Sequence, residues 1–241
     1  MINLLLSLGA GLLVFGAFWL SRIVHPLGAI LPGVVAFGLS FFFLARRTMR
    51  QLEAVMGLAQ KELAQRKLDR AVAVMESAFS LGRWQFLIAS QLHGQIGVVL
   101  YLQKKFEEAE PHLKKAFVKM WVPRAMFGAL LYRRKEWEAM EETFETALRS
   151  NKGESLLYAV YAWCEDKRGQ KTRAVEILQR GATQNPSDER LKNLLVRVQN
   201  DKRMRMDAFG QEWDQFWLET PKAMQQGQGG GFGLRQTRWR R

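Results

Sequence analysis

Residues that carry metal and nucleophile chemistry are scarce in this sequence. A single cysteine, Cys164, excludes both a disulfide within the chain and a metal knuckle built from several thiolates. The three histidines, His25, His93 and His112, lie far apart and show no zinc-protease spacing. The sequence also lacks phosphate-binding loops and nucleophile elbows. We therefore expect no catalytic, cofactor-binding or metal-binding residue, and a protein that is not an enzyme.

Charge is almost missing from the first 45 residues, where Arg22 is the only charged side chain. Two uncharged runs, residues 4–20 and 27–45, are each close to the ~20 apolar residues that a helix needs to cross a bilayer. A short connection that includes Pro26 joins them, so two spanning helices would have to be antiparallel. The uncharged start does not suit a cleavable signal peptide. The sequence predicts a transmembrane helical hairpin, with a buried pair of soluble helices as the alternative.

Basic residues follow this hairpin directly. Arg46, Arg47 and Arg50 come immediately after the second run, whereas the predicted tip carries Arg22 alone. The positive-inside rule then places the rest of the chain, and the N-terminus, in the cytoplasm. We expect the lipid bilayer as a partner through residues 4–45. The net charge of +13, from 36 basic and 23 acidic side chains, also favours contact with anionic lipid headgroups.

A repeated pattern of small and large apolar residues runs from residue 52 to residue 186. Small residues, with Met140 as an exception, recur seven positions apart, and a large apolar residue stands three positions before the second of each pair. A further small residue lies twelve positions before each pair. This spacing predicts pairs of helices that touch at the small residues. The four sets are Ala59, Ala71, Met75 and Ala78; Gly97, Ala109, Leu113 and Ala116; Gly128, Met140, Phe144 and Ala147; and Ala162, Ala174, Leu178 and Gly181.

The pattern resembles the tetratricopeptide repeat, in which two helices meet at small residues and a bulky side chain fills the space between them. The segment Phe106-Glu107-Glu108-Ala109 is similar to the family's entry to its second helix. Successive sets are 38, 31 and 34 residues apart, against a family period of about 34. The resemblance implies about four helical pairs over residues 51–186. With a two-span anchor, residues 1–50, before the repeats, the layout is similar to that of HemY-like proteins of the bacterial inner membrane.

The resemblance also implies a binding groove, lined by the first helix of each pair. Lysine and asparagine do not occupy the positions that a clamp for a C-terminal carboxylate requires, so that clamp is not expected. Aromatic and aliphatic side chains instead favour an apolar or amphipathic protein segment as the ligand. Packing between repeats is the alternative role for these side chains. The resemblance assigns the following residues to the groove: Gln91, Val98, Tyr101, Ala129, Tyr132, Arg133, Trp163 and Lys167.

The chain changes character after residue 186. Ser187 is a candidate helix N-cap, and the apolar spacing that follows predicts a capping and amphipathic helix over residues 187–220. Its second apolar stripe, residues 206–217, either packs on the repeats or lies in the membrane interface. Residues 221–241 form a Gly/Gln-rich flexible linker and a basic tail. Because that tail is short, we do not expect nucleic acid as a partner.

Together these features predict an all-α protein with a transmembrane hairpin, a tetratricopeptide-like α-solenoid and a C-terminal capping helix. We expect a multi-pass adaptor of the bacterial inner membrane, which recruits or organises protein partners at the cytoplasmic face through a partly apolar groove. The alternative is a structural subunit of a membrane complex, held mainly through its hairpin. The sequence defines neither the partner nor the oligomeric state.

Overall fold

The structure is a computed structural model that describes residues 1–21, 26–85 and 87–219. Within this described part of the chain the regular secondary structure is entirely helical, which confirms the all-α prediction. The chain divides into two compact units, Met1–Arg124 and Ala125–Arg241. The predicted hairpin turn at residues 22–25 and the predicted linker and basic tail lie outside the described residues.

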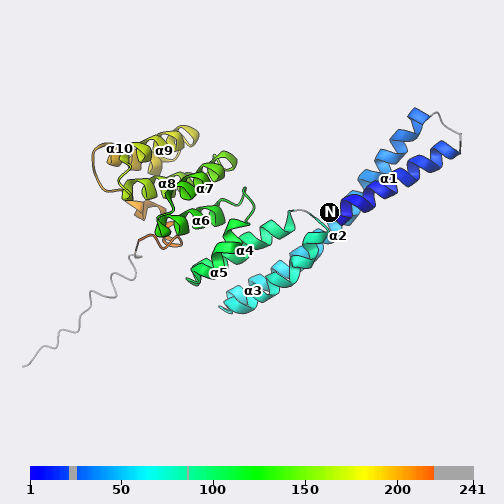
Figure 1. The fold of residues 1–241 in the computed structure, drawn as a ribbon, viewed down its shortest axis with the longest axis horizontal. Helices are drawn as coiled ribbons and strands as arrows, with labels where there is room; N and C mark the ends of the chain where they lie inside the picture. The colour runs from blue at the N-terminus through cyan, green and yellow to red at the C-terminus, as the bar shows by residue number, and fades with distance from the viewer. Residues whose placement is uncertain (22–25, 86, 220–241) are drawn as a thin grey trace, which may run out of the picture. The chain divides into compact units, whose positions relative to one another are not determined.

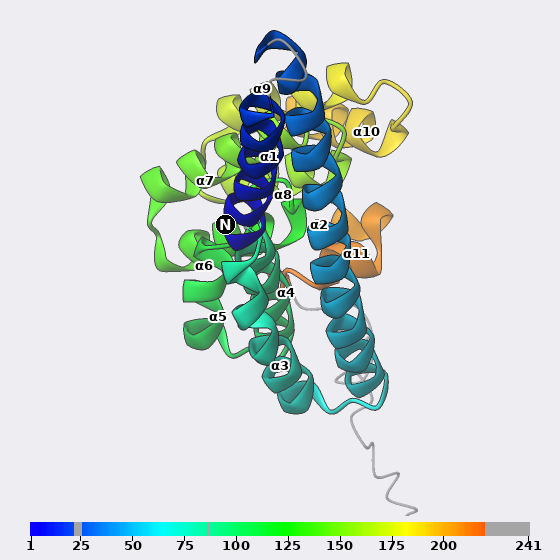
Figure 2. The same cartoon turned by 90° about the vertical axis from the view of Figure 1, so that its right-hand side faces the viewer.

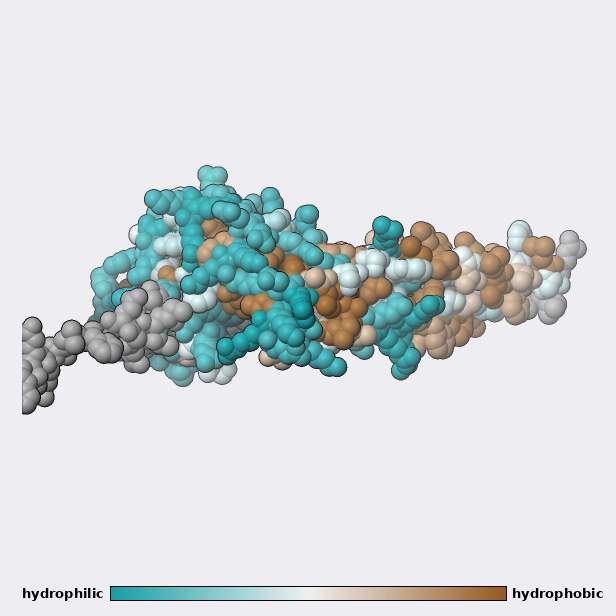
Figure 3. All heavy atoms as spheres, turned by 90° about the horizontal axis from the view of Figure 1, so that it is seen from below, coloured by the Kyte–Doolittle hydropathy of each residue, from teal (hydrophilic) through white to brown (hydrophobic). Residues whose placement is uncertain are grey.

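Unit 1 begins with a hairpin of α1 (Ile2–Leu20) and α2 (Pro26–Ala64), which pack side by side (Figure 1). Many of their large apolar side chains face outward; Leu13 is 77% exposed and Leu20 is 78% exposed. Figure 3 shows this apolar surface, in brown, along the hairpin. Both helices are long and apolar enough to cross a membrane. A pair of soluble helices would bury such a surface, so its exposure favours a hydrocarbon environment.

Small residues set the distance between α1 and α2. A Cβ added at Gly11 would lie 2.9 Å from the Gly33 carbonyl oxygen and 2.9 Å from the Phe37 Cβ. A Cβ added at Gly33 would lie 3.0 Å from the Phe15 Cβ, and Ser7 on α1 is completely buried. Side chains larger than hydrogen at these glycines would push the helices apart, as expected for the contact face of a membrane helix pair.

The second helix of the hairpin continues far beyond its apolar part. It runs without interruption through Arg46, Arg47 and Arg50 to Ala64, and α3 (Leu68–Ser77) then returns along its outer end (Figure 2). The small residues Ala59 on α2 and Ala71 on α3 are completely buried. The predicted first helical pair is therefore made by the end of α2 and by α3.

The remainder of unit 1 contains a second helical pair. A 3-10 helix, η1 (Ala78–Arg83), leads to α4 (Ile88–Leu102), which packs on α5 (Phe106–Lys114). A Cβ added at Gly97 on α4 would lie 2.8 Å from Leu113 Cδ2 on α5. Ala109 and Leu113 are completely buried. The small residue and the bulky residue of the sequence pattern thus meet at the helix–helix contact.

Unit 2 begins within α6 (Trp121–Arg134) and continues through α7 (Trp137–Ser150), α8 (Ser155–Lys167), α9 (Lys171–Gln184) and α10 (Glu189–Gln199). Figure 1 shows α8, α9 and α10 side by side. Every residue of α8 from Leu156 to Glu165 is buried, so this helix lies at the centre of the unit.

The small residues of the pattern also lie at helix contacts in unit 2. A Cβ added at Gly128 on α6 would be 2.5 Å from two ring atoms of Phe144 on α7. A Cβ added at Gly181 on α9 would be 2.9 Å from the Tyr158 Cβ on α8. The Phe144 ring stacks on Tyr161, with ring centroids 4.9 Å apart. These contacts explain the residue pattern, while the tetratricopeptide identity itself stays a prediction.

The same backbone turn joins the two helices of every pair. Arg66, Lys104, Lys135 and Gly169 have φ angles of 60°, 63°, 61° and 91°. In each turn the following residue donates its backbone N–H to the carbonyl five residues earlier, at 2.9–3.0 Å. This geometry satisfies the carbonyls at the end of the first helix. The four turns are 38, 31 and 34 residues apart, which is the spacing of the sequence repeat.

The C-terminal region of unit 2 differs from the predicted continuous helix. After α10, the 3-10 helix η2 (Met206–Phe209) and the short α11 (Gln211–Asp214) replace its second half. The positive φ angles of Asp201 (55°) and Gly210 (53°) end the helical path at both places. The N-cap of α10 is Asp188 rather than Ser187, since the Asp188 carboxylate accepts the Arg190 backbone N–H at 3.0 Å.

Candidate functional site

Three of the predicted groove residues meet on one face of unit 2. The ring of Tyr132, on α6, lies edge-on to the ring of Trp163, on α8, with centroids 5.6 Å apart. The ammonium of Lys167, one turn after Trp163, is 5.5 Å from that indole ring. Attraction between a cation and an aromatic face holds the Lys167 head over the cluster. The register of the repeat therefore does bring these three side chains together.

This face already holds a segment of the protein itself. The Trp213 ring, on α11, packs edge-on to Trp163 with centroids 5.3 Å apart. Trp163 is only 4% exposed as a result, and the Arg133 guanidinium donates a hydrogen bond to the Trp217 carbonyl oxygen. Residues 206–219, which we call the covering segment, are held by four side chains of the apolar stripe that are each 4% exposed or less: Met206, Phe209, Trp213 and Phe216.

The packing of this segment decides between the two interpretations of the stripe at residues 206–217. Met206, Phe209, Trp213 and Phe216 are buried in unit 2, whereas Trp217 is half-buried, so the stripe packs mainly on the helices of this unit. The Arg190 guanidinium, on α10, lies 4.5 Å from the Phe209 ring centroid and fixes the start of the segment.

Other predicted groove residues are less accessible than the pattern suggests. Tyr101, on α4 in unit 1, is completely buried, with its ring centroid 5.1 Å from that of Phe106. Ala129, on α6, is also completely buried. Neither side chain offers surface to a partner, because each lies on the packed side of its helix. Gln91 and Val98, both on α4, are half-buried and retain accessible surface.

A pocket of about 470 Å³ remains open beside the aromatic cluster. Burial raises the pKa of Tyr132 above its usual value, so its hydroxyl stays neutral there. Tyr132 and Lys167 are among the groove residues that the repeat pattern predicts, whereas Lys135 and Trp137, at the turn between α6 and α7, are not. Lys135 and Trp137, which directly follow α6, were the signal in the sequence that could have predicted this part of the pocket. The pocket is lined by Tyr132, Lys135, Trp137, Lys167, Arg168 and Gln170.

A buried carboxylate supports the floor of this pocket. The Glu165 side chain is completely buried and pairs with Arg168 at 2.7 Å, while Arg168 also pairs with Glu141, on α7, at 2.5 Å. Burial raises the pKa of the Glu165 carboxyl, and the positive charge of Arg168 opposes that shift. The Arg168 guanidinium lies 5.8 Å from the Trp137 ring centroid. These contacts hold Arg168 in place, so Lys135 and Lys167 supply the adaptable positive charge.

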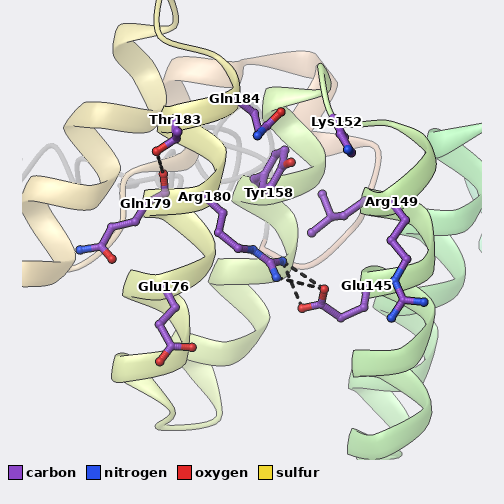
Figure 4. Close-up of a pocket in the computed structure, with 10 residues that line it drawn as sticks. Glu145, Arg149, Lys152, Tyr158, Glu176, Gln179, Arg180, Thr183 and Gln184 are labelled. Carbon is purple, nitrogen blue, oxygen red and sulfur yellow. Dashed lines mark hydrogen bonds and ion pairs between the residues drawn. The ribbon is translucent and has the colours of Figure 1, made fainter.

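A second pocket, of about 590 Å³, opens between α7 and α9 (Figure 4). The Arg180 guanidinium reaches across it to the Glu145 carboxylate, with contacts of 3.1 Å to both oxygens. Arg173 also contacts Glu145, at 3.0 Å. Figure 4 shows Tyr158 above this ion pair, and Arg149 beside Glu145 on α7. The opposed charges satisfy one another, so this cluster joins the second helices of two pairs.

The predicted membrane-flanking residues lie on the exposed surface of α2. Arg46, Arg47 and Arg50 are all exposed. Between them, the Thr48 hydroxyl accepts a hydrogen bond from the Asn3 side-chain amide at 3.0 Å. The start of α1 and the basic turn of α2 therefore lie at the same level of the hairpin.

Comparison with protein-family models and with curated proteins finds no match to this chain. Its function is therefore proposed from its own residues and geometry.

Proposed function

We propose that this protein is an adaptor anchored in the bacterial inner membrane by α1 and α2, with its remaining helices in the cytoplasm. The outward-facing apolar side chains of the hairpin support the anchor. The exposed arginines that follow it support the orientation, because basic residues flank the cytoplasmic end of membrane spans.

The helical pairs form a tetratricopeptide-like scaffold in this proposal. Four repetitions of one interhelical turn, at the spacing of the sequence pattern, support equivalent helix pairs. Stacked pairs of this kind use the exposed surface of their first helices to bind protein segments.

The face formed by α6 and α8 is the proposed binding surface. The observation that carries this proposal is that the same face already holds an aromatic segment of the chain, through the contact between Trp163 and Trp213. The open pocket beside it combines the Tyr132 ring with the exposed cations Lys135 and Lys167. We propose that the partner contributes an amphipathic segment with both apolar and acidic side chains, since these complement the pocket.

Photo-crosslinking in cells tests this proposal. A photoreactive amino acid at Lys135 or Lys167 should crosslink to a defined protein partner, and the same amino acid at Glu142 or Thr172 should not. These control positions are exposed on α7 and α9, the second helices. With the probe at residue 167, the charge reversal Lys135→Glu should abolish the crosslink, and with the probe at residue 135, Lys167→Glu should do the same, while Lys152→Glu should preserve both crosslinks. Equal crosslinking at all four positions would contradict a specific surface.

The alternative proposal is a structural subunit held through its hairpin. An apolar groove of about 410 Å³ on the hairpin favours it, because another membrane helix fits such a surface. Gly11, Phe15, Gly33 and Phe37 help to line this groove. Replacing the hairpin with an unrelated two-span anchor separates the proposals. The adaptor retains its crosslinks at Lys135 and Lys167 after the exchange, whereas the structural subunit loses its partners.

A further inference from the structure

The start of α1 is tied to a loop that lies far away in the sequence. The Asn3 backbone N–H donates to the Trp84 carbonyl oxygen at 3.3 Å, and the Met1 ammonium donates to the Arg83 carbonyl oxygen at 2.5 Å. The Asn3 side-chain amide donates to Thr48 on α2. One residue of α1 thus holds both the basic turn of α2 and the loop after η1, and all three segments lie at one level of the hairpin.

This level is the end of the apolar part of the hairpin. From residue 27 to Arg46, α2 rises by about 28 Å at 1.5 Å per residue, close to the ~30 Å thickness of bilayer hydrocarbon. If the anchor spans the membrane, the headgroup layer lies beside Arg46, Arg47 and Arg50. The loop bound to Asn3 must then lie beside the same layer.

The loop carries the side chains that this layer favours. Trp84 is 39% exposed and is the one aromatic residue among the exposed large apolar side chains described outside the hairpin. Indole rings concentrate at the headgroup level, where their apolar body and polar N–H both find partners. The adjacent Arg83 is also exposed. Four arginines, Arg83 and the three of α2, therefore lie near this level, against one acid, Glu53, one turn further along α2.

The end of η1, which Trp84 directly follows, is also held in a fixed shape. A Cβ added at Gly82, in η1, would lie 3.1 Å from the Ala89 Cβ at the start of α4, so η1 packs closely on that helix. The Trp84 backbone N–H bonds to the Leu81 carbonyl oxygen at 2.9 Å. Trp84 is therefore presented by ordered backbone, which lowers the entropic cost of binding a surface.

We propose that Trp84 and Arg83 form a third membrane contact, inserted in the headgroup layer of an anionic bilayer beside the arginines of α2. This inference rests on the membrane anchorage put forward under the proposed function. It assigns to unit 1 a defined face that meets the membrane, in addition to the two helices that cross it.

Depth measurements on the full-length protein test this contact. A nitroxide label is attached to Trp84→Cys, Phe42→Cys or Arg66→Cys, each in a Cys164→Ala background, in vesicles of phosphatidylethanolamine and phosphatidylglycerol. Collision with oxygen reports hydrocarbon and collision with a soluble nickel chelate reports water. Oxygen should dominate at residue 42 in the apolar run, and nickel at residue 66 in the turn after α2. Residue 84 should give an intermediate ratio, and so should Arg83→Cys, which retains the indole.

The labels at residues 84, 66 and 42 distinguish the possible failures. If residue 84 is as accessible to nickel as residue 66 while residue 42 lies in hydrocarbon, the anchor stands and the third contact is refuted. If residue 42 is also accessible to nickel, the membrane anchorage fails and this inference fails with it. The lipid composition tests the headgroup. If the label at residue 84 is as accessible to nickel as residue 66 in vesicles of phosphatidylcholine, but gives an intermediate ratio when phosphatidylglycerol is present, the anionic headgroup is confirmed as the ligand.

Discussion

Replacing Gly128 by alanine adds one methyl group at a close contact between α6 and α7 in unit 2. The new Cβ would lie 2.5 Å from two atoms of the Phe144 ring, whereas ordinary contacts begin at 3.4 Å. One side must therefore move by roughly 0.9 Å, the difference between these distances. The ring has little freedom to do so, because it is completely buried and stacks on Tyr161.

Two opposing effects determine the net change in the free energy of unfolding. Overfilling a packed core costs about 1–3 kcal/mol, and alanine gains up to about 1 kcal/mol over glycine inside a helix. We expect Gly128→Ala to destabilise unit 2 by about 1–2 kcal/mol, which corresponds to a roughly 5- to 30-fold larger open population. Combining it with Phe144→Leu should cost less than the sum of the two single changes, because the shorter side chain leaves room for the methyl group.

Amide hydrogen exchange of the full-length protein measures this locally. Peptides from α6, α7 and α8 should exchange roughly 5- to 30-fold faster in Gly128→Ala. Gly57→Ala is the matched control, since a Cβ there meets nothing within 4 Å and the helix propensity should slow exchange in α2. Unchanged or slower exchange around Gly128 would refute the packing reasoning.

Three further predictions concern charged groups. Asp188→Ala should destabilise α10 by about 1 kcal/mol, because the helix loses its N-cap. Asp188→Asn should destabilise it much less, because asparagine also caps helices. Amide exchange in α10 measures both variants, and equal effects would contradict a capping role. Arg168→Ala leaves the buried Glu165 carboxylate without its cation, a loss of about 3–5 kcal/mol at neutral pH. Because burial raises the pKa of Glu165 in the folded state, this loss should shrink as the pH falls toward the ordinary carboxyl value, which thermal unfolding of variant and wild type at two pH values checks. The ring nitrogens of His93 and His112 are 3.2 Å apart, and burial lowers both pKa values below 6.5. The contribution of the two neutral rings to the free energy of unfolding is therefore complete above pH 6.5 and is lost as the pH falls below it. A histidine NMR titration with either midpoint above 6.5 would contradict this.

The features that the sequence predicts well depend on neighbouring residues in the chain. The pair of long apolar helices follows from two uncharged runs. The helical pairs follow from small residues at fixed spacing, because each set lies on two helices joined by a short turn. Local patterns of this kind determine which residues touch before the tertiary fold is known.

The accessible surface was harder to predict. Burial of α8 from Leu156 to Glu165 leaves no polar face over that stretch, so the periodicity cannot show which side of Trp163 is covered. The covering segment contacts that helix from about 50 residues further along the chain, and it does so through a chain path that Asp201 and Gly210 redirect. For Tyr101 and Ala129, complete burial favours the alternative of packing between repeats, since register alone does not separate the packed edge of a first helix from its exposed edge.

The uninterrupted length of α2 has a mechanical consequence. From Arg46 to Ala64 the helix contains no proline and rises about 27 Å at 1.5 Å per residue. A stiff rod of that length converts a change in the tilt of the hairpin into a displacement of its outer end. A tilt of about 10° would carry Ala64, and α3 with it, sideways by about 5 Å. If α1 and α2 span a bilayer as proposed, a change in its thickness that alters their tilt would thereby displace α3 as well.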